Sequence, residues 1–458
     1  MSSTQFSTEI QTTISPHSQE PYTTRIYPSI TELDATIAKV AAAQKQWAKV
    51  SLDQRIQIAT KFVLTMQMGR PIAQTKSEIN GFLDRAKYMI SIAKSSLQDI
   101  PIVEQDTGKD KPGFKRFIRR TPLGVVLLPY LTSINSVLPA LISGNTVLLK
   151  PSPQTPLTAE RFAAALIEAG VPEDVIQVVH LTPELTQHAV EDKRVDFVSF
   201  TGSVVGGKKV EEAAVRANGF KGVALELGGK DPAYVRSDAD LDYTAAELVD
   251  GAFFNSGQSC CAVERIYVHE SIYEPFVEKY VDIVKKYKLG DPTDTSTNLG
   301  PVVSLAAAER IRKQVDDAVN KGRSFKEEKI GTTYVAPQVL IDVDHSMNLM
   351  TEETFGPVIG IQKVSSDDEA IKLMNDSPYG LTASVWTAAE HNPASEAAFM
   401  NIVDQVETGT VFLNRCDFLD PALAWTGVKD SGRGISLSKF GYDQLTRAKS
   451  VHMKIKTA

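Results

Sequence analysis

The stretch GVVLLPYLTSINSVLPALISGNTVLLK, residues 124–150, decides the fold. Short apolar runs stand at its two ends, Gly124–Leu128 and Thr146–Leu149, with a helical stretch between them. Strands that are apolar throughout, without polar alternation, are typical of a parallel sheet covered on both faces. The stretch therefore predicts a strand–helix–strand unit of an α/β domain.

The same alternation continues downstream. Further apolar strands are expected at Val175–Val179, Asp196–Phe200 and Val223–Leu227, again separated by helices. Five such strands predict a doubly wound parallel sheet of the nucleotide-binding type. After Gly229 the alternation starts again and runs to about Asn414, which predicts a second α/β domain.

Other parts of the chain depart from this pattern. About the first 25 residues are expected to be loose. Residues 100–104 and 114–120 are expected to be extended, with a polar Gly- and Pro-containing turn at 106–112 between them. The tail 447–456 alternates apolar and polar residues, which predicts a half-buried strand. Because an exposed strand edge seeks a partner, an intersubunit strand is expected there.

The composition is ordinary for a globular protein, with 458 residues of which 42% are hydrophobic and 23% charged. The formal net charge of -7 gives no reason to expect nucleic acid or an anionic membrane as a partner. No apolar run approaches the roughly 20 residues of a membrane helix, and the polar N-terminus does not resemble a secretory signal. With three cysteines and no ligand-spaced histidines, neither a disulfide framework nor a metal site is expected. A cytoplasmic location is therefore expected.

Two side chains stand out as chemically useful. In FFNSGQSCCAVER, residues 253–265, Cys260 follows a helix that is expected to break at residues 255–257. The strand VALELGG, residues 223–229, carries one acid, Glu226. A thiol at a broken helix end and a carboxylate at a strand end fit a nucleophile and a base that act on a carbonyl. A buried structural cysteine and an ion-paired carboxylate are the alternatives.

Six motifs together resemble one family, and the resemblance covers nearly the whole chain. They occur in the order seen in the NAD(P)-dependent aldehyde dehydrogenase superfamily. The motifs are LLKPSPQTP (148–156), FTGS (200–203), VALELGGKDP (223–232), FFNSGQSCCAVER (253–265), EETFGPV (352–358) and WTGVKDSGRG (425–434). Any one of them alone would be weak, whereas six in order are specific.

The resemblance implies an aldehyde dehydrogenase-like α/β fold with three parts. The cofactor-binding domain would comprise residues 1–97 and 121–228, and the catalytic domain residues 229–435. Residues 98–120 and 436–458 would form a small oligomerisation element, so a homodimer or homotetramer is expected. The implied reaction oxidises a small-molecule aldehyde to a carboxylate with NAD or NADP.

The resemblance also assigns the catalytic roles. Cys260 occupies the position of the family's nucleophile, which leaves Cys261 as a packed neighbour. Glu226 resembles the general base that activates water against the thioester. A member that acylates coenzyme A would release an acyl-CoA instead, and an acid at position 226 favours hydrolysis over this alternative.

Three residues resemble the family's pyrophosphate turn. Gly202 and Ser203 follow a strand and open a helix, and Gly207 matches the second glycine of the turn. Free N–H groups at a helix N-terminus suit a pyrophosphate. A simple tight turn is the alternative, because the fingerprint G-x-G-x-x-G is absent. The resemblance also places Leu227 at the cofactor.

The remaining cofactor contacts are expected at the two ends of the dinucleotide. Lys150 resembles the lysine that contacts the adenosine ribose, with Ser152 beside it. Many NAD-preferring members carry an acid at the position of Pro153, where a carboxylate would repel a 2′-phosphate. Its absence indicates that NADP is at least tolerated. Glu353 and Phe355 resemble the residues that hold the nicotinamide ribose and ring.

One family feature is absent. After the strand at 124–128 the family has Pro-Trp-Asn, whose asparagine donates a hydrogen bond to the oxyanion, whereas here residues 129–131 read Pro-Tyr-Leu. Asn135 lies in the following helix and is not assigned to this role. Losing one oxyanion donor costs about 10²–10³ in rate, so a weakly active or non-catalytic cofactor-binding protein is the alternative. Residues 62–66 and 324–331 also look contracted.

The sequence does not define the aldehyde. Arg265 and Arg415 are candidates for holding a carboxylated substrate, with a structural ion pair as the alternative for each. Asn414 matches an asparagine near the family's site, and no role is assigned to it. Semialdehydes and simple aliphatic or aromatic aldehydes all stay open.

Overall fold

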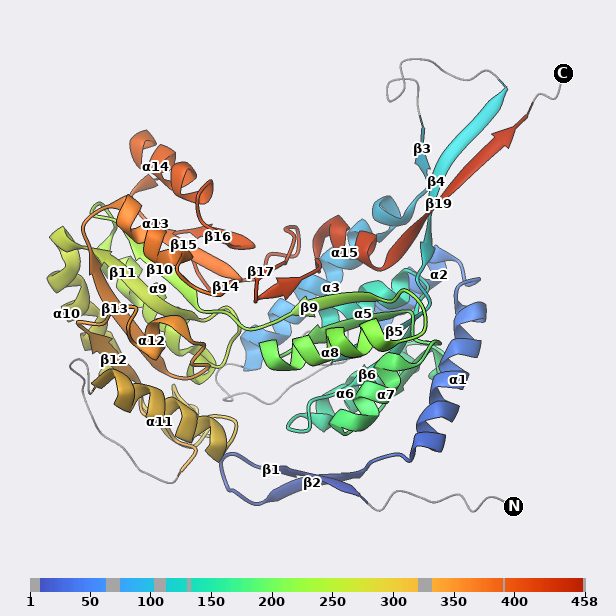
Figure 1. Cartoon of the computed structure of the whole chain (residues 1–458), viewed down its shortest axis with the longest axis horizontal. Helices are drawn as coiled ribbons and strands as arrows, with labels where there is room; N and C mark the ends of the chain where they lie inside the picture. Colours follow the sequence, from blue (N-terminus) through green and yellow to red (C-terminus); the bar gives the residue numbers. More distant parts are fainter. Residues whose placement is uncertain are drawn as a thin grey trace.

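The structure is a computed structural model. It describes residues 9–62, 75–102, 113–129, 133–319, 332–389 and 392–455. Figure 1 shows two α/β bodies side by side and an arm of long strands that projects beyond them near the C-terminus. Among the described helices, none is both long and apolar enough to cross a membrane.

The first sheet confirms the five predicted strands. Within the described residues its strands are β5 (Val125–Pro129), β6 (Thr146–Lys150), β7 (Ile176–Val178), β8 (Phe197–Thr201), β9 (Gly222–Glu226) and β18 (Gly432–Arg433). The spatial order is β18-β9-β8-β5-β6-β7, in which β5 to β9 are parallel and β18 is antiparallel to β9. The direction of the winding changes between β5 and β8, and ligands bind at the carboxyl edge of such a switch point.

Helices cover both faces of this sheet. They are α1 (Ile30–Trp47), α2 (Leu52–Phe62), α3 (Thr75–Leu97), α5 (Ser133–Ile142), α6 (Pro156–Glu168), α7 (Pro183–Glu191) and α8 (Val204–Arg216), with a 3-10 turn η1 (Glu173–Val175). Along β5, Val126 and Leu128 pack into one apolar cluster, whereas Val125 and Leu127 pack into another. This alternation places one cluster on each face of the sheet and explains why β5 is apolar throughout.

The second sheet is also parallel. Its described strands, in spatial order, are β12 (Gln338–Ile341), β13 (Val358–Val364), β11 (Val263–His269), β10 (Asp231–Val235), β15 (Thr382–Trp386) and β16 (Thr410–Leu413). Its helices are α9 (Leu241–Phe253), α10 (Tyr273–Val284), α11 (Leu305–Val319), α12 (Asn348–Thr351), α13 (Asp367–Asn375) and α14 (Pro393–Val403), with the 3-10 turns η2 (Phe254–Gly257) and η3 (Glu270–Ile272). A short antiparallel pair, β14 (Tyr379–Gly380) and β17 (Val428–Lys429), accompanies them.

The expectation of a loose N-terminal segment is wrong for the residues that are described. β1 (Ile10–Ile14) and β2 (Pro21–Ile26) form an antiparallel hairpin. Thr13 Oγ1 donates to the carbonyl of Pro153 in the first body (2.6 Å), and Thr333 Oγ1 of the second body donates to the carbonyl of Pro16 (2.5 Å). These long-range bonds order a segment whose own sequence gives little sign of structure.

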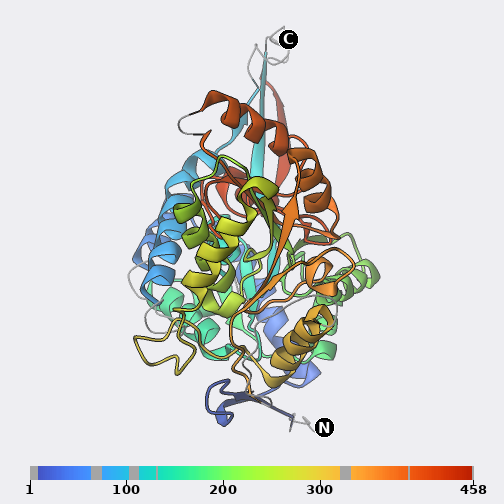
Figure 2. The same cartoon turned by 90° about the vertical axis from the view of Figure 1, so that its left-hand side faces the viewer.

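The arm consists of β3 (Ile100–Pro101), β4 (Phe114–Pro122) and β19 (Thr446–Lys454), which α15 (Ser438–Gln444) precedes. β19 pairs antiparallel with β4 from Thr446 opposite Pro122 to Lys454 opposite Phe114. Its predicted half-burial is wrong within this one chain, because most of its residues are exposed. Figure 2 shows the arm and the N-terminal hairpin at opposite ends of the molecule.

Three predictions fall wholly or largely on segments outside the described residues. They are the polar turn at 106–112, the shortened segment after β5, and the contractions at 62–66 and 324–331. The boundaries of the three predicted domains also stay a prediction.

Candidate active site

The loop that carries the two neighbouring cysteines begins where α9 ends. Beyond Phe253 the backbone of Asn255, Ser256 and Gly257 is left-handed, with φ of 52°, 57° and 69°. This confirms the predicted break of the helix. A Cβ at position 257 would lie 2.2 Å from the carbonyl oxygen of Gly356. Only glycine combines such a φ with so close an approach of another backbone.

Hydrogen bonds from the motif's polar side chains hold this loop. Asn255 Nδ2 donates to the carbonyl of Gln258 (2.9 Å), and Gln258 Oε1 accepts from the N–H of Val303 (2.8 Å). Ser256 Oγ donates to the carbonyl of Gly300 (3.0 Å). The loop is therefore fixed at both ends before the chain reaches the cysteines.

The two cysteines have different surroundings. Cys261 is 2% exposed, and its Sγ donates to Asp417 Oδ1 (2.9 Å), which also accepts from Ser259 Oγ (3.0 Å). A hydrogen bond with Cys260, burial and the charge of Asp417 raise the pKa of Cys261 well above its usual value. Cys260 is half-buried. Because the thiolate is the nucleophile, these surroundings disfavour Cys261 and favour Cys260.

Glu226 is the last residue of β9 and lies opposite Gly432 of β18. Burial raises the pKa of its carboxyl group, and the nearby hydroxyl of Ser436 and the positive charge of Arg85 only partly oppose the rise. Since burial dominates, Glu226 differs from the ion-paired carboxylate that was the alternative interpretation. A carboxylate with a raised pKa is suited to take a proton from water near neutral pH.

Two glycines after Glu226 form the junction of the site. A Cβ at Gly228 would lie 2.4 Å from both carboxylate oxygens of Glu353, and one at Gly229 would lie 2.6 Å from the carbonyl oxygen of Cys260. The N–H of Gly229 also donates to Glu353 Oε1 (3.3 Å). The end of the strand that carries the acid therefore contacts both the cysteine loop and the loop of Glu353.

Glu353 and Phe355 lie in the loop before β13. Burial raises the pKa of Glu353 to about 7, and the negative charge of Glu264 adds to the rise. Phe355 has a left-handed backbone with φ of 50°. This conformation costs an aromatic residue on the order of 1 kcal/mol or more, and such strain concentrates at functional sites.

The predicted pyrophosphate turn lies at the carboxyl end of β8. Ser203 is the N-cap of α8, and its side chain accepts from the N–H of Gly206 (3.2 Å). Gly202 precedes it with φ of 158°. A Cβ at Gly207 would lie 2.7 Å from Leu227 Cδ2, so α8 packs directly against the residue that follows β9. The geometry thus brings Gly207 and Leu227 together.

Lys150 and Ser152 lie at the carboxyl end of β6. Burial lowers the pKa of Lys150, and its Nζ donates to the carbonyl of Pro151 (3.2 Å). Ser152 Oγ accepts from the N–H of Gln154 (3.3 Å). Only β5 separates β6 from β8 in the sheet. The predicted adenosine and pyrophosphate residues therefore share one carboxyl edge, which fits an extended dinucleotide.

Of the two arginines considered for a carboxylated substrate, Arg265 is structural. It is 1% exposed and donates to the carbonyls of Lys230 (2.7 Å) and Met374 (2.9 Å). Arg415 is exposed, and its Cζ lies 3.4 Å from the ring centroid of Phe418. Only Arg415 stays a candidate.

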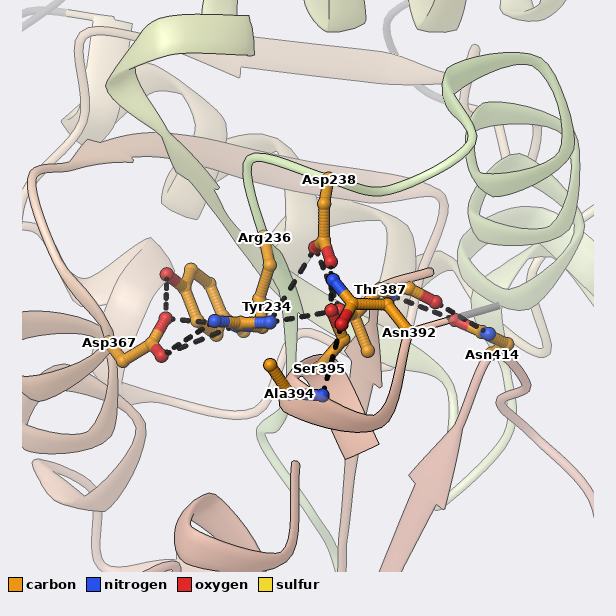
Figure 3. Close-up of polar contacts among 9 residues, drawn as sticks. All are labelled: Tyr234, Arg236, Asp238, Asp367, Thr387, Asn392, Ala394, Ser395 and Asn414. Atoms are coloured by element: carbon orange, nitrogen blue, oxygen red, sulfur yellow. Dashed lines mark hydrogen bonds and ion pairs between the residues drawn. The ribbon is translucent and has the colours of Figure 1, made fainter. Parts of the chain in front are cut away.

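Asn414 has structural partners. Its Oδ1 accepts from the N–H of Thr387 and its Nδ2 donates to the carbonyl of Thr387, both at 2.9 Å. Figure 3 shows this pair beside a polar cluster in which Arg236 lies between Asp367 and Asp238. The cluster ties the carboxyl ends of β10 and β15 to α13, and Asn414 joins the end of β16 to it.

Sequence reasoning missed a buried ion pair beside these loops. Lys230 Nζ and Glu264 Oε2 are 2.7 Å apart, with side-chain exposures of 0% and 4%. Lys230 lies in the motif that was noted for Glu226, and Glu264 lies in the motif that was noted for Cys260. A charged residue in an apolar strand was the available signal, since buried charges need partners.

A doubly wound sheet beside a second parallel sheet, with a thiol loop and an acid at their junction, defines an NAD(P)-dependent dehydrogenase with the aldehyde dehydrogenase fold. The chain matches the model of the aldehyde dehydrogenase family over residues 2–451 and belongs to that family. It is an NAD(P)-dependent aldehyde dehydrogenase.

Three similar proteins are matched over nearly the whole chain. The succinate-semialdehyde dehydrogenase [NADP(+)] of Mycobacterium avium (strain 104) is 34% identical over 466 residues, which cover 96% of each protein. The NAD-dependent aldehyde dehydrogenase of Sinorhizobium meliloti is 30% identical with a TM-score of 0.90, covering 98% of this chain and 92% of that one. The succinic semialdehyde dehydrogenase of Streptococcus pyogenes, solved with NADP+, is 27% identical with a TM-score of 0.88, covering 97% of this chain and 100% of that one.

Proposed function

We propose that this chain oxidises its aldehyde with Cys260 as the nucleophile and Glu226 as the general base. The junction at Gly228 and Gly229 carries this proposal, because it holds the end of the acid-bearing strand against the cysteine loop and against Glu353. The protonated state of Cys261 supports the choice of the first cysteine.

In the proposed cycle the Cys260 thiolate adds to the aldehyde carbonyl, which forms a C–S bond and leaves the negative charge on oxygen. Bound NAD(P)+ would supply a hydride acceptor, and loss of hydride from the carbon to it would leave a thioester on Cys260. Glu226 takes a proton from water, and the hydroxide so formed displaces the thiolate from the thioester. The carboxylic acid that is released gives its proton to solvent and leaves as the carboxylate. The chain contributes mainly alignment of these groups.

The chain's own residues fit a dinucleotide. The N-terminus of α8 at Ser203 suits the pyrophosphate, and the carboxylate of Glu353 suits the ribose hydroxyls. Lys150 and Ser152 at the end of β6 suit a 2′-phosphate, and Pro153 offers no charge to repel it. We therefore propose that NADP is accepted at least as a tolerated cofactor, which the two NADP-linked relatives support. A preference for NAD of a hundredfold or more in kcat/KM would contradict this.

The substrate class that we propose is a semialdehyde, an aldehyde that also bears a carboxylate. Two of the similar proteins are named as succinate-semialdehyde dehydrogenases. Arg415 is exposed and lies two residues before Asp417, which binds Cys261, so a guanidinium stands close in sequence to the cysteine loop. Arg415→Gln should raise KM for succinate semialdehyde about tenfold or more, the typical effect of losing one charged hydrogen bond, and leave KM for an uncharged aliphatic aldehyde unchanged.

A weakly active or non-catalytic protein was the alternative, because the family's Trp-Asn pair is absent. The enzyme relatives give this alternative no support. The oxyanion donor that we propose is the backbone N–H of Cys260. If the missing asparagine limits the rate, inserting a Trp-Asn segment after Leu128 should raise turnover by about 10² or more. An unchanged rate would show that the missing asparagine does not limit turnover.

The remaining proposals concern the assembly. We propose a homodimer or homotetramer built through the exposed edge of β19, the three-part division into cofactor-binding, catalytic and oligomerisation regions, and a cytoplasmic location. The exposure of β19 in the single chain supports the first of these.

The test of the proposed function is a panel of aldehydes with NAD+ and NADP+, read by the absorbance of the reduced cofactor. The wild type should be active with at least one aldehyde. Cys260→Ala should abolish oxidation, whereas Cys261→Ala should keep it within a few-fold, because Cys261 is the buried and protonated neighbour. Loss of activity only in Cys261→Ala would overturn the assignment.

A further inference from the structure

The buried carboxylate of Glu264 binds two consecutive backbone groups of the 353–355 loop. Its Oε2 accepts from the N–H of Thr354 and its Oε1 from the N–H of Phe355, both at 2.8 Å. Lys230 Nζ donates to the same Oε2 (2.7 Å) and to Thr354 Oγ1 (2.9 Å). Glu264 is the second residue of β11, and Lys230 directly follows the glycine junction. The 353–355 loop is therefore bound by residues from two separate parts of the chain.

The contacts of Glu264 indicate that it sets the conformation of the 353–355 loop and does more than stabilise the fold. A buried ion pair alone is often no more stable than an apolar pair of equal volume. Here the carboxylate also accepts hydrogen bonds from two backbone amides, and hydrogen bonds to a charged group are stronger than those between neutral groups. Two such bonds oppose the strain of the left-handed backbone at Phe355. Glu264 therefore stabilises a backbone conformation that the chain would otherwise avoid.

The network surrounds Glu353. On one side, Thr354 and Phe355 follow it and are bound by Glu264. On the other side, Gly229, the neighbour of Lys230, donates to Glu353 Oε1 (3.3 Å). We propose that Glu264 is a positioning residue, which sets the backbone of Thr354 and Phe355 so that Glu353 and Phe355 bind the nicotinamide end of the cofactor. This inference rests on the proposed function.

Glu264 also acts on Glu353 through its charge. After burial, the charge of Glu264 is the largest influence that raises the pKa of Glu353 to about 7. The N–H of Gly229 and the charges of Lys230 and Arg310 oppose this rise, and the phenol of Tyr379 also faces Glu353. The Glu353 carboxylate accepts hydrogen bonds from ribose hydroxyls better than the acid does, so cofactor affinity should rise with pH around 7.

The test is the variant Glu264→Gln, with Glu352→Gln as the matched control. Glutamine keeps the volume but has one acceptor oxygen, so it cannot bind Thr354 N–H and Phe355 N–H together while also neutralising Lys230. Glu352 is an exposed carboxylate in the same loop. The dissociation constants of NAD+ and NADP+ are measured by calorimetry from about pH 5.5 to 9 for all three proteins, without substrate.

Glu264→Gln should weaken cofactor binding about tenfold or more at high pH, since one lost charged hydrogen bond is worth at least that factor. The midpoint of its pH dependence should also move to lower pH, because the charge that raises the pKa of Glu353 is gone. The charge of Glu264 affects the pKa of Glu353 more than the charge of Lys230 does. The midpoint should therefore still move to lower pH if Lys230 loses its proton in the variant. The control should match the wild type in both respects.

A folded Glu264→Gln with wild-type affinity and an unmoved midpoint would overturn the inference. A variant that is less stable yet binds normally would show a structural role only, and would also overturn it. If Glu264→Gln does not fold, the double variant Lys230→Met, Glu264→Gln removes the unpaired buried charge and should still bind cofactor about tenfold more weakly. Failure of the wild type to bind either dinucleotide would instead contradict the proposed function.

Discussion

At the residue scale, the site depends on groups whose pKa values are raised by their surroundings. Cys261 is kept as a thiol by Cys260, burial and Asp417, whereas Glu226 and Glu353 are carboxyl groups with raised pKa values. The roles of Cys260 and Glu226 could be predicted from the sequence only because the motifs supplied them, since a lone thiol and a lone acid each had an ordinary alternative. The pairing of Lys230 with Glu264 could not be predicted, because it joins positions 34 residues apart.

Glu353 should make the unliganded protein less stable as pH rises. Its folded pKa of about 7 lies above its ordinary value of 4.5, so stability is fully present below about pH 4.5 and is lost as pH rises through 7. Glu353→Gln should therefore raise the free energy of unfolding at about pH 8 by up to about 3 kcal/mol, with little effect at about pH 4. Chemical denaturation at both pH values measures this, and an equal effect at both would contradict it.

At the element scale, the periodicity of the chain predicted the parallel strands well, because buried strands must be apolar whatever surrounds them. The break after α9 was also predicted, since the polar run at 255–257 ends the helical pattern. The hairpin of β1 and β2 was missed because its order comes from bonds to Pro153 and Thr333, which lie far along the chain. The exposure of β19 was missed for a similar reason: its alternating pattern predicts burial that a single chain does not provide.

The cysteine loop should not tolerate a side chain at its turn. Gly257→Ala would place a Cβ 2.2 Å from the Gly356 carbonyl oxygen at φ of 69°, so we expect a loss of at least about 2 kcal/mol of stability and about 10²-fold lower turnover from a displaced thiol. Gly81→Ala is the control, because a Cβ there meets nothing within 4 Å and its helix should gain up to about 1 kcal/mol. Thermal denaturation and turnover report both effects. Wild-type turnover in Gly257→Ala would show that the turn does not set the thiol's position.

At the scale of the whole molecule, two α/β bodies lie side by side and an arm extends away from them (Figure 1). The glycines at 228 and 229 join the first sheet to the loops of Cys260 and Glu353. The arm leaves the edge of β19 open, and we expect that edge to pair between subunits. Truncation after Thr446 should therefore shift the protein from an oligomer to a monomer in sedimentation velocity. Truncation after Ile455 is the control and should stay oligomeric. If the protein truncated after Thr446 stays oligomeric, the interface lies elsewhere.

In the proposed cycle, the acyl group of the substrate is bound covalently to Cys260 and is released by the action of Glu226. The most direct measurement is mass spectrometry of Glu226→Gln after incubation with an aldehyde and NAD(P)+, with fragmentation that separates positions 260 and 261. We expect close to one acyl group per chain on Cys260, together with one equivalent of reduced cofactor. Reduced cofactor without any acylated cysteine, or an acyl group on Cys261, would contradict it.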